Sequence, residues 1–187
     1  MHIPLFYLYE SMKQIMYRLP KSDIYNQQIL YQPSIEHIIP RRLFYHKKDA
    51  NDLLNLSFCD RHTNSKRSDY KYGDYHSIPT IFQEKEWVKP VMNIPRVYYP
   101  KKEDHLELDR DLKINISGYI NPQKRIFYPY QCADFGLISR SIVAMLSKYP
   151  YLYDNLNEII ENPNLLSKWS EYPISEFEEQ RNALNIF

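Results

Sequence analysis

The chain of 187 residues carries 24 Lys plus Arg against 23 Asp plus Glu, a formal net charge of +1, and 43% hydrophobic residues. That charge excludes a uniformly basic surface, so any contact with nucleic acid must be local. Its three glycines, Gly73, Gly118 and Gly136, stand too far apart for a glycine-rich phosphate loop. A chain of this length can bury one substantial core, so we expect a single domain over residues 1–187.

The N-terminal region predicts one amphipathic helix. Apolar residues at three- and four-residue spacings favour a helix over residues 5–19, ended by Pro20. The apolar run is too short and too interrupted for a membrane span, and a signal-peptide pattern is missing. Cys59 and Cys132 are too few for a disulfide framework, and we expect both to be buried. These features predict an intracellular protein without a membrane partner; for a viral protein, the virion or the viral factory would be the location.

The rest of the chain alternates short strands with helices. Residues 34–74 predict the order strand, loop, strand, helix, because two short apolar runs precede a polar segment. Recurrent prolines over residues 76–131 predict loops and short edge strands. Helical periodicity returns from Ala133 onward, and Ser175 followed by Glu178 predicts a capping box. The expected fold class is α+β, with a strand and loop region over 73–131 and a helical part over 132–187.

A possible catalytic constellation lies within the first of these regions. Glu36 and His37 end the first predicted strand, Asn55 opens the second, and Asn64 falls in the helical segment. Mg²⁺ takes oxygen ligands, which Glu36 and the Asn64 amide can supply, and a neutral His37 can accept a proton from water. Taken singly, His37 beside a carboxylate is usually a surface pair, and an asparagine here usually caps a turn.

The combined pattern E-H-I-I-P, then N-L, then N-S-K-R resembles the HNH or ββα-metal nuclease motif. Within that superfamily it is similar to the endonuclease I group, through Glu36-His37, residues 52–56 and residues 64–70, with Asp69 where that group usually has Asn. Further likeness lies in Phe127 and Pro129, in residues 136–140, and between Trp169 and Asn182. The resemblance covers roughly residues 34–187.

This resemblance implies a ββα-metal core at about residues 34–72, flanked by an N-terminal helix and a C-terminal helical bundle. It implies an endonuclease of low sequence specificity that cuts DNA, with RNA also open, and leaves 5′-phosphate and 3′-hydroxyl ends. Glu36 and Asn64 would bind one Mg²⁺, a site that Mn²⁺ or Ca²⁺ can also occupy. His37 would be the general base, oriented through a backbone carbonyl, and Asn55 would hold the hairpin and loop in register.

Local charge suggests where nucleic acid binds. Residues 36–72 contain eight basic and five acidic residues, net +3, whereas residues 154–187 contain two basic and seven acidic residues, net −5. We expect the acidic segment to face away from the site. The arginine that clamps the scissile phosphate in the family has no secure counterpart here. The candidate nucleic-acid contacts are Arg41, Arg42, Lys47, Lys48, Lys66 and Arg67.

Several alternatives stay open. Cys59 and His62 have zinc-like spacing, but too few ligands accompany them, so we expect a buried cysteine and an exposed histidine without zinc. Tyr70, Tyr72 and Tyr75 could stack on bases or fill the core. The chain could instead be a site-specific restriction or homing enzyme, or an inactive binding or structural protein on the same fold. A non-specific nuclease inside a cell calls for an inhibitor or packaging partner, and the sequence leaves oligomeric state open.

Overall fold

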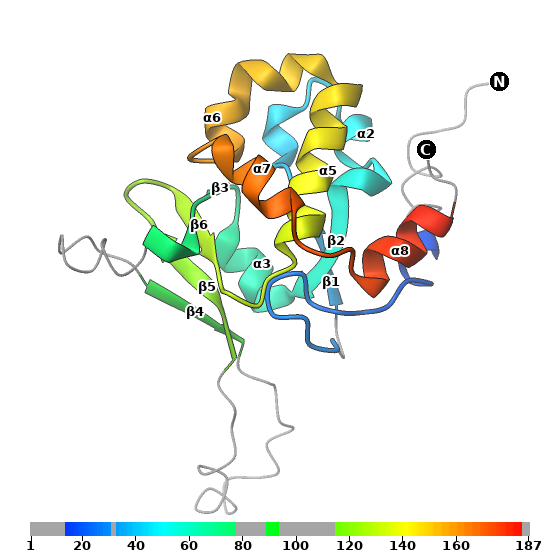
Figure 1. The fold of residues 1–187 in the computed structure, drawn as a ribbon, viewed down its shortest axis with the longest axis horizontal. Coiled ribbons are helices and arrows are strands. Elements are labelled where there is room, and N and C mark those ends of the chain that lie inside the picture. The colour runs from blue at the N-terminus through cyan, green and yellow to red at the C-terminus, as the bar shows by residue number, and fades with distance from the viewer. Residues whose placement is uncertain (1–13, 31–32, 78–88, 94–114, 185–187) are drawn as a thin grey trace, which may run out of the picture.

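Two small β-sheets and a set of helices make up the part of the chain that the computed structural model describes, residues 14–30, 33–77, 89–93 and 115–184 (Figure 1). This mixed composition agrees with the predicted α+β class. Of the helix predicted over residues 5–19, residues 14–16 are helical and residues 5–13 lie outside the described residues. Among the helices described, none is long and apolar enough to cross a membrane.

The first sheet pairs β1 (Pro33–His37) with β2 (Leu56–Asp60) in antiparallel register, so that Glu36 lies opposite Ser57. Between them the chain forms η1 (Arg41–Leu43), α2 (Lys47–Ala50) and η2 (Leu53–Asn55). Helix α3 (Arg61–Arg67) begins directly after β2, because the Asp60 side chain accepts hydrogen bonds from the backbone N–H groups of His62 and Thr63. The predicted order of strand, loop, strand and helix is therefore confirmed.

The second sheet has the order β3-β6-β5-β4, formed by β3 (Lys71–Tyr72), β6 (Ile126–Pro129), β5 (Asn115–Asn121) and β4 (Lys89–Asn93). Pro90 lies on the edge strand β4, as expected for a residue without a backbone N–H. The prediction of edge strands was wrong for β5 and β6, which are interior. Gly118 permits this close packing, since a Cβ there would lie 2.5 Å from the Tyr128 carbonyl oxygen.

Helix α3 packs between the two sheets. The Thr63 hydroxyl donates to Ser117 Oγ of β5 at 3.0 Å. On the other side, the Asn64 amide donates to the Ile35 carbonyl of β1 at 2.9 Å. After β3, a single turn η3 (Tyr75–Ser77) leads out of the described segment. The helix is thus fixed against both sheets at the end of β1.

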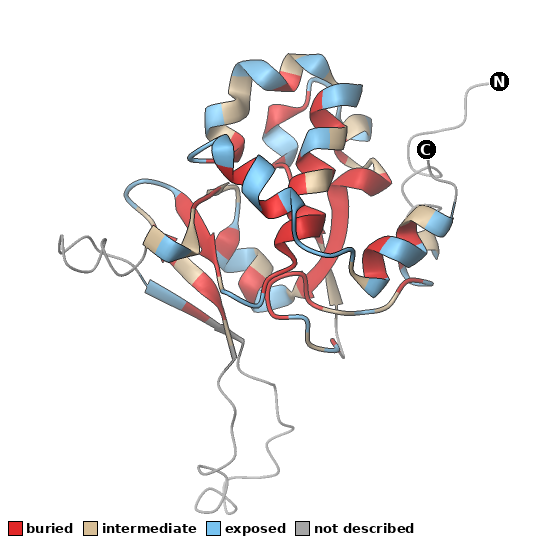
Figure 2. Ribbon diagram, viewed as in Figure 1, coloured by how far each residue is buried: buried red, intermediate tan, exposed pale blue. Residues whose placement is uncertain are grey.

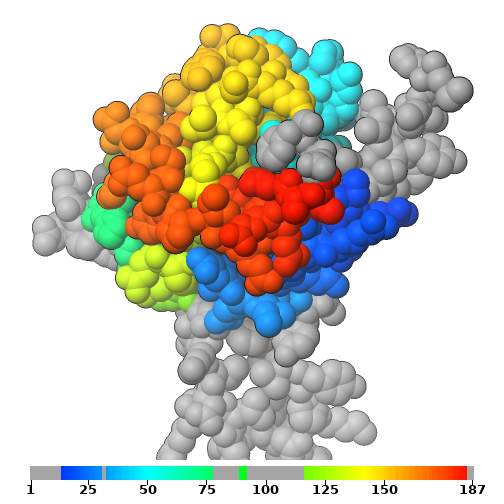
Figure 3. Space-filling model, turned by 45° about the vertical axis from the view of Figure 1, so that its right-hand side comes forward, coloured from blue at the N-terminus to red at the C-terminus, as the bar shows by residue number. Residues whose placement is uncertain are grey.

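The C-terminal part is helical, as predicted. It contains α5 (Phe135–Lys148), η4 (Pro150–Asn155), α6 (Leu156–Ile159), α7 (Asn164–Ser170) and α8 (Glu176–Ala183). Buried residues gather along α5 and β2 (Figure 2). Helix α8 lies against the N-terminal segment around residues 20–29 (Figure 3).

Two local predictions need correction. Ser175 caps α8 by accepting from the Glu178 N–H at 3.3 Å, but only this half of the capping box forms, because the Glu178 carboxylate pairs with Arg140 instead. Cys59 is buried as expected, whereas Cys132 is exposed; both are free thiols. Cys132 lies in the turn after β6, beside the exposed Gln131.

Candidate active site

A cavity of about 280 Å³ opens where β1 ends beside α3. It is lined by Glu36, His37, Pro40, Arg41, Arg42, Asn64, Arg67, Ser68 and Asp69. The fold therefore brings six of the ten predicted site residues to one place. The four that do not line it are Asn55, Lys47, Lys48 and Lys66.

Asn64 is oriented by the strand it crosses. Its Nδ2 donates to Ser34 Oγ and to the Ile35 carbonyl, each at 2.9 Å. These two bonds use both amide hydrogens and fix the direction of the amide plane. Within the described part of the chain, Oδ1 of Asn64 accepts no hydrogen bond. One oriented oxygen acceptor is thus available at the cavity.

Glu36 is enclosed rather than open. Its side chain is 1% exposed, and Oε1 accepts from Arg67 Nη1 at 2.6 Å and from the Tyr25 hydroxyl at 2.8 Å. Oε2 accepts a long hydrogen bond, 3.8 Å, from the Cys59 thiol. Burial raises the pKa of Glu36, and the Arg67 charge and the hydrogen bonds offset this only in part.

Arg67 is buried together with Glu36. Its guanidinium also donates to the carbonyls of His37 at 2.8 Å and Ile38 at 2.7 Å, and it lies 4.8 Å from the centre of the Tyr72 ring. In the part of the chain that the structure describes, its Nε has no hydrogen-bond partner. Arg67 therefore holds Glu36 and the end of β1, which corrects the prediction that it contacts nucleic acid. Tyr72 is likewise fully buried and does not offer a ring for base stacking.

His37 is fixed through its ring. Nε2 lies 3.0 Å from Oδ1 of Asn51, at the end of α2. Because an amide oxygen only accepts, this contact places the hydrogen on Nε2 and leaves Nδ1 as a lone-pair acceptor. Burial lowers the pKa of His37 to about 4; the Asn51 bond opposes this shift, and the charges of Arg41 and Arg67 add to it. The ring is therefore neutral around pH 7.

Sequence reasoning missed Asn51. The expected partner of His37 was a backbone carbonyl, and the structure has a side-chain amide instead. Asn51 follows a four-residue helix in an irregular loop and belongs to no periodic pattern. Its only signal was its place directly before Asp52, in the turn that leads into β2.

Asn55 ties the loop between the strands. It is fully buried; Oδ1 accepts from Ile39 N at 2.7 Å, and Nδ2 donates to the carbonyls of Ile39 at 3.1 Å and Ala50 at 2.9 Å. Every polar atom of its side chain is thus paired with backbone. The bonds join the start and the end of the loop that carries Arg41 and Arg42.

The rim of the cavity carries a chain of charges. Arg42 Nε lies 2.7 Å from Asp69 Oδ2, and the other Asp69 oxygen pairs with Arg125 from the turn between β5 and β6. A second guanidinium nitrogen of Arg42 pairs with Glu158 of α6. The expectation that the acidic segment 154–187 faces away is therefore wrong at Glu158. Two residues after α6, the Glu161 N–H donates to the Tyr72 carbonyl of β3, and this contact holds the segment that carries Glu158 near the rim.

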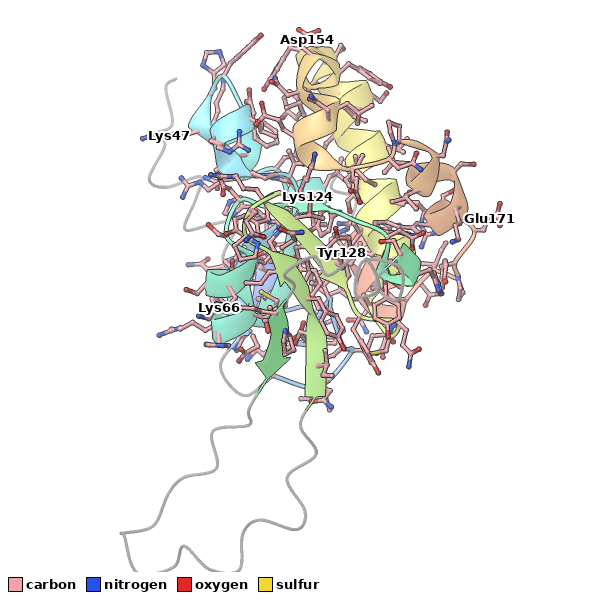
Figure 4. All side chains as sticks on the ribbon, turned by 90° about the vertical axis from the view of Figure 1, so that its left-hand side faces the viewer. Lys47, Lys66, Lys124, Tyr128, Asp154 and Glu171 are labelled. Carbon is pink, nitrogen blue, oxygen red and sulfur yellow. The ribbon has the colours of Figure 1, made fainter. Side chains whose placement is uncertain are left out.

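The predicted lysines lie outside the cavity. Lys47, Lys48 and Lys66 are exposed, and Lys47 from α2 and Lys66 from α3 point outward along the same edge of the molecule (Figure 4). Helix α8 lines a different cavity, of about 410 Å³, together with residues 20–29. The exposed His62 and the buried Cys59 take the positions expected for them.

The donors at the cavity fit a magnesium-type ion. Asn64 offers an oriented amide oxygen, and within residues 14–30, 33–77, 89–93 and 115–184 Oε2 of Glu36 accepts only from the Cys59 thiol. Mg²⁺ prefers oxygen and commonly keeps several waters, so one or two protein ligands suffice. Larger ligand clusters of three or more His, Cys, Asp or Glu do not occur among the described residues.

No protein-family model matches this chain, and comparisons with curated proteins and with solved structures gave no match. The side chains around the cavity and their geometry therefore carry the functional proposal.

Proposed function

We propose that this protein is an endonuclease of the ββα-metal type, which hydrolyses phosphodiester bonds of DNA with little sequence preference. The observation that carries the proposal is a neutral, oriented His37 in the same cavity as the oxygen donors Glu36 and Asn64. A base, a pair of hard oxygen ligands and an exposed arginine are what hydrolysis of a phosphodiester requires.

His37 would take a proton from the attacking water at Nδ1. Asn51 holds the ring so that this nitrogen is the free one, and its amide oxygen would stabilise the imidazolium that forms. A pKa of about 4 alone makes a weak base. The negative charge of a bound phosphate raises this pKa toward neutrality, so the base gains strength only when substrate is present.

Glu36 and Asn64 would hold one divalent ion. When bound, such an ion stabilises the charge that develops on the phosphate and on the departing 3′ oxygen. Arg67 fixes the Glu36 carboxylate through Oε1, and Ser34 and Ile35 fix the amide of Asn64. The exposed Arg41 at the cavity would neutralise charge on the substrate. Contacts to the phosphate backbone carry no sequence information, which suits a non-specific enzyme.

Cleavage of supercoiled plasmid tests the proposal. We expect activity with Mg²⁺ and none with EDTA, and a loss of at least about 100-fold for His37→Ala, the low end of general-base contributions. His62→Ala is the matched control, because His62 is an exposed histidine on α3 outside the cavity, and it should cleave like the unchanged protein. Full activity in EDTA, or in His37→Ala, would contradict the mechanism. A discrete band ladder at limiting enzyme would favour a site-specific nuclease instead.

A further inference from the structure

Asp69 lies between two arginines at the mouth of the cavity. Arg42 Nε donates to its Oδ2 at 2.7 Å, and Arg125 pairs with its Oδ1. The two arginines come from distant parts of the chain, the loop after β1 and the turn between β5 and β6. One carboxylate is thus held from two sides by two guanidinium groups.

The position of Arg125 is set by its backbone. Its φ is 54°, in the left-handed region, and its carbonyl accepts from Lys71 N at 3.1 Å, at the start of β3. Its guanidinium lies 5.7 Å from the centre of the Tyr70 ring. The side chains of Arg125 and Arg42 are nevertheless 57% and 41% exposed. Both arginines therefore hold Asp69 and are still accessible from solvent.

A phosphodiester can replace the carboxylate in this arrangement. Guanidinium groups bind carboxylates and phosphates through the same planar pattern of N–H donors, and a phosphodiester offers two free oxygens. Exposed ion pairs contribute little net free energy, so replacing the Asp69 carboxylate by a phosphate costs little free energy. Arg41 adds an exposed positive charge to the cavity lining, and Arg42 also pairs with Glu158, so Asp69 is not its sole anchor.

We propose that Arg42 and Arg125 form a binding site for a backbone phosphate of nucleic acid, and that Asp69 occupies this site while nucleic acid is absent. The inference rests on the proposed function, since the strand that contributes this phosphate also enters the cavity. Asp69 is then a built-in competitor that weakens binding of nucleic acid.

Binding measured without cleavage tests this site. A short fluorescent DNA duplex is titrated with protein in EDTA at low salt, and anisotropy gives the Kd. Asp69→Asn should lower the Kd by about 3- to 10-fold, because two exposed ion pairs no longer have to be broken. Glu171→Gln is the matched control, since it makes the same charge change at an exposed residue far from the cavity (Figure 4), and its Kd should stay unchanged.

Arg125→Ala locates the effect. It should raise the Kd of the otherwise unchanged protein, and it should remove most of the gain when combined with Asp69→Asn. Equal gains from Asp69→Asn and Glu171→Gln would overturn the site, because overall charge would then explain them. So would an unchanged or higher Kd for Asp69→Asn, no effect of Arg125→Ala, or no binding by any variant.

These outcomes are separate from those of the nuclease assay. A specific gain in affinity for Asp69→Asn, in a protein that does not cleave with Mg²⁺, would establish the phosphate site and contradict the nuclease. Cleavage with Mg²⁺, without a specific gain in affinity for Asp69→Asn, would support the nuclease and contradict the phosphate site.

Discussion

Two arginine–glutamate pairs lie at least partly buried in different halves of the molecule. In the half formed by β1, β2 and α3, Arg67 and Glu36 meet at 2.6 Å and both side chains are 1% exposed. In the helical half, Arg140 of α5 binds Glu178 of α8 through two bonds of 2.8 and 2.6 Å. The bond lengths are alike, yet the surroundings of the two pairs differ.

In the helical half, the remaining donors of Arg140 are all hydrogen-bonded to backbone carbonyls of the protein. Arg140 also donates to the carbonyls of Ser170, Tyr172 and Pro173, so it joins α5 to the connection between α7 and α8. Among the described residues, Arg67 Nε has no hydrogen-bond partner and Oε2 of Glu36 accepts only from the Cys59 thiol. The Arg140–Glu178 pair thus uses its polar atoms within the fold, whereas the proposed function would use the unpaired atoms of the Arg67–Glu36 pair beside the cavity.

The largest expected effect in this comparison belongs to Glu36→Gln. The substitution leaves the Arg67 guanidinium buried without an anion, and a guanidinium cannot lose its proton to escape that penalty. We expect the free energy of unfolding in urea to fall by about 3–5 kcal/mol, as for other buried pairs that lose one partner. A loss below about 1 kcal/mol would mean that water reaches Arg67, and the contrast between the pairs would disappear.

Asn55→Ala sharpens the comparison. Asn55 lies in the half formed by β1, β2 and α3, but all its side-chain polar atoms are hydrogen-bonded, like those of Arg140. Its loss leaves the Ile39 N–H and the carbonyls of Ile39 and Ala50 without partners. We expect a loss of about 3 kcal/mol in unfolding free energy, from buried polar groups left unpaired. Unchanged stability together with lost cleavage would instead place Asn55 in the chemistry.

Much of the fold was predictable because local patterns decide it. The short apolar runs around Glu36 and Asn55 predicted β1 and β2, and helical spacing predicted the C-terminal part. Glu36, His37 and Asn64 line one cavity, in agreement with their predicted places at the end of the first strand and in the following helix. Interior strands such as β5 were missed, since their burial depends on partners far away in the chain.

The finer design of the site was not predictable from spacing. Arg67 was predicted to contact nucleic acid, and only the tertiary structure shows that Glu36 lies beside it. Asn51 and Arg125 come from an irregular loop and a tight turn, where no periodicity marks a residue. Sequence patterns show which face of an element is apolar, but not which charged side chains that face encloses.

A pH dependence of stability is expected from Asp23, which lies beside β2. Burial raises the pKa of Asp23 to about 7, although the N–H groups of Tyr25 and Asp60 lower it. A carboxyl whose pKa is raised on folding stabilises the fold below its unfolded pKa of about 3.8 and loses that contribution as pH rises through 7. The unchanged protein should therefore lose about 2 kcal/mol relative to Asp23→Asn between pH 5 and pH 8, measured by urea unfolding. A difference independent of pH would show that Asp23 titrates normally.

The smallest effect is expected for Glu178→Gln, the counterpart of Glu36→Gln in the helical half. Arg140 keeps its three backbone carbonyls and is 26% exposed, so water can solvate the guanidinium once the carboxylate is gone. We expect a loss of about 1 kcal/mol in unfolding free energy, near the upper end for pairs open to solvent, with cleavage and binding of nucleic acid unchanged. If Glu178→Gln destabilised the protein as much as Glu36→Gln, burial of the arginine would not be what separates the two pairs. The unused atoms at the cavity would then be the only difference left between them.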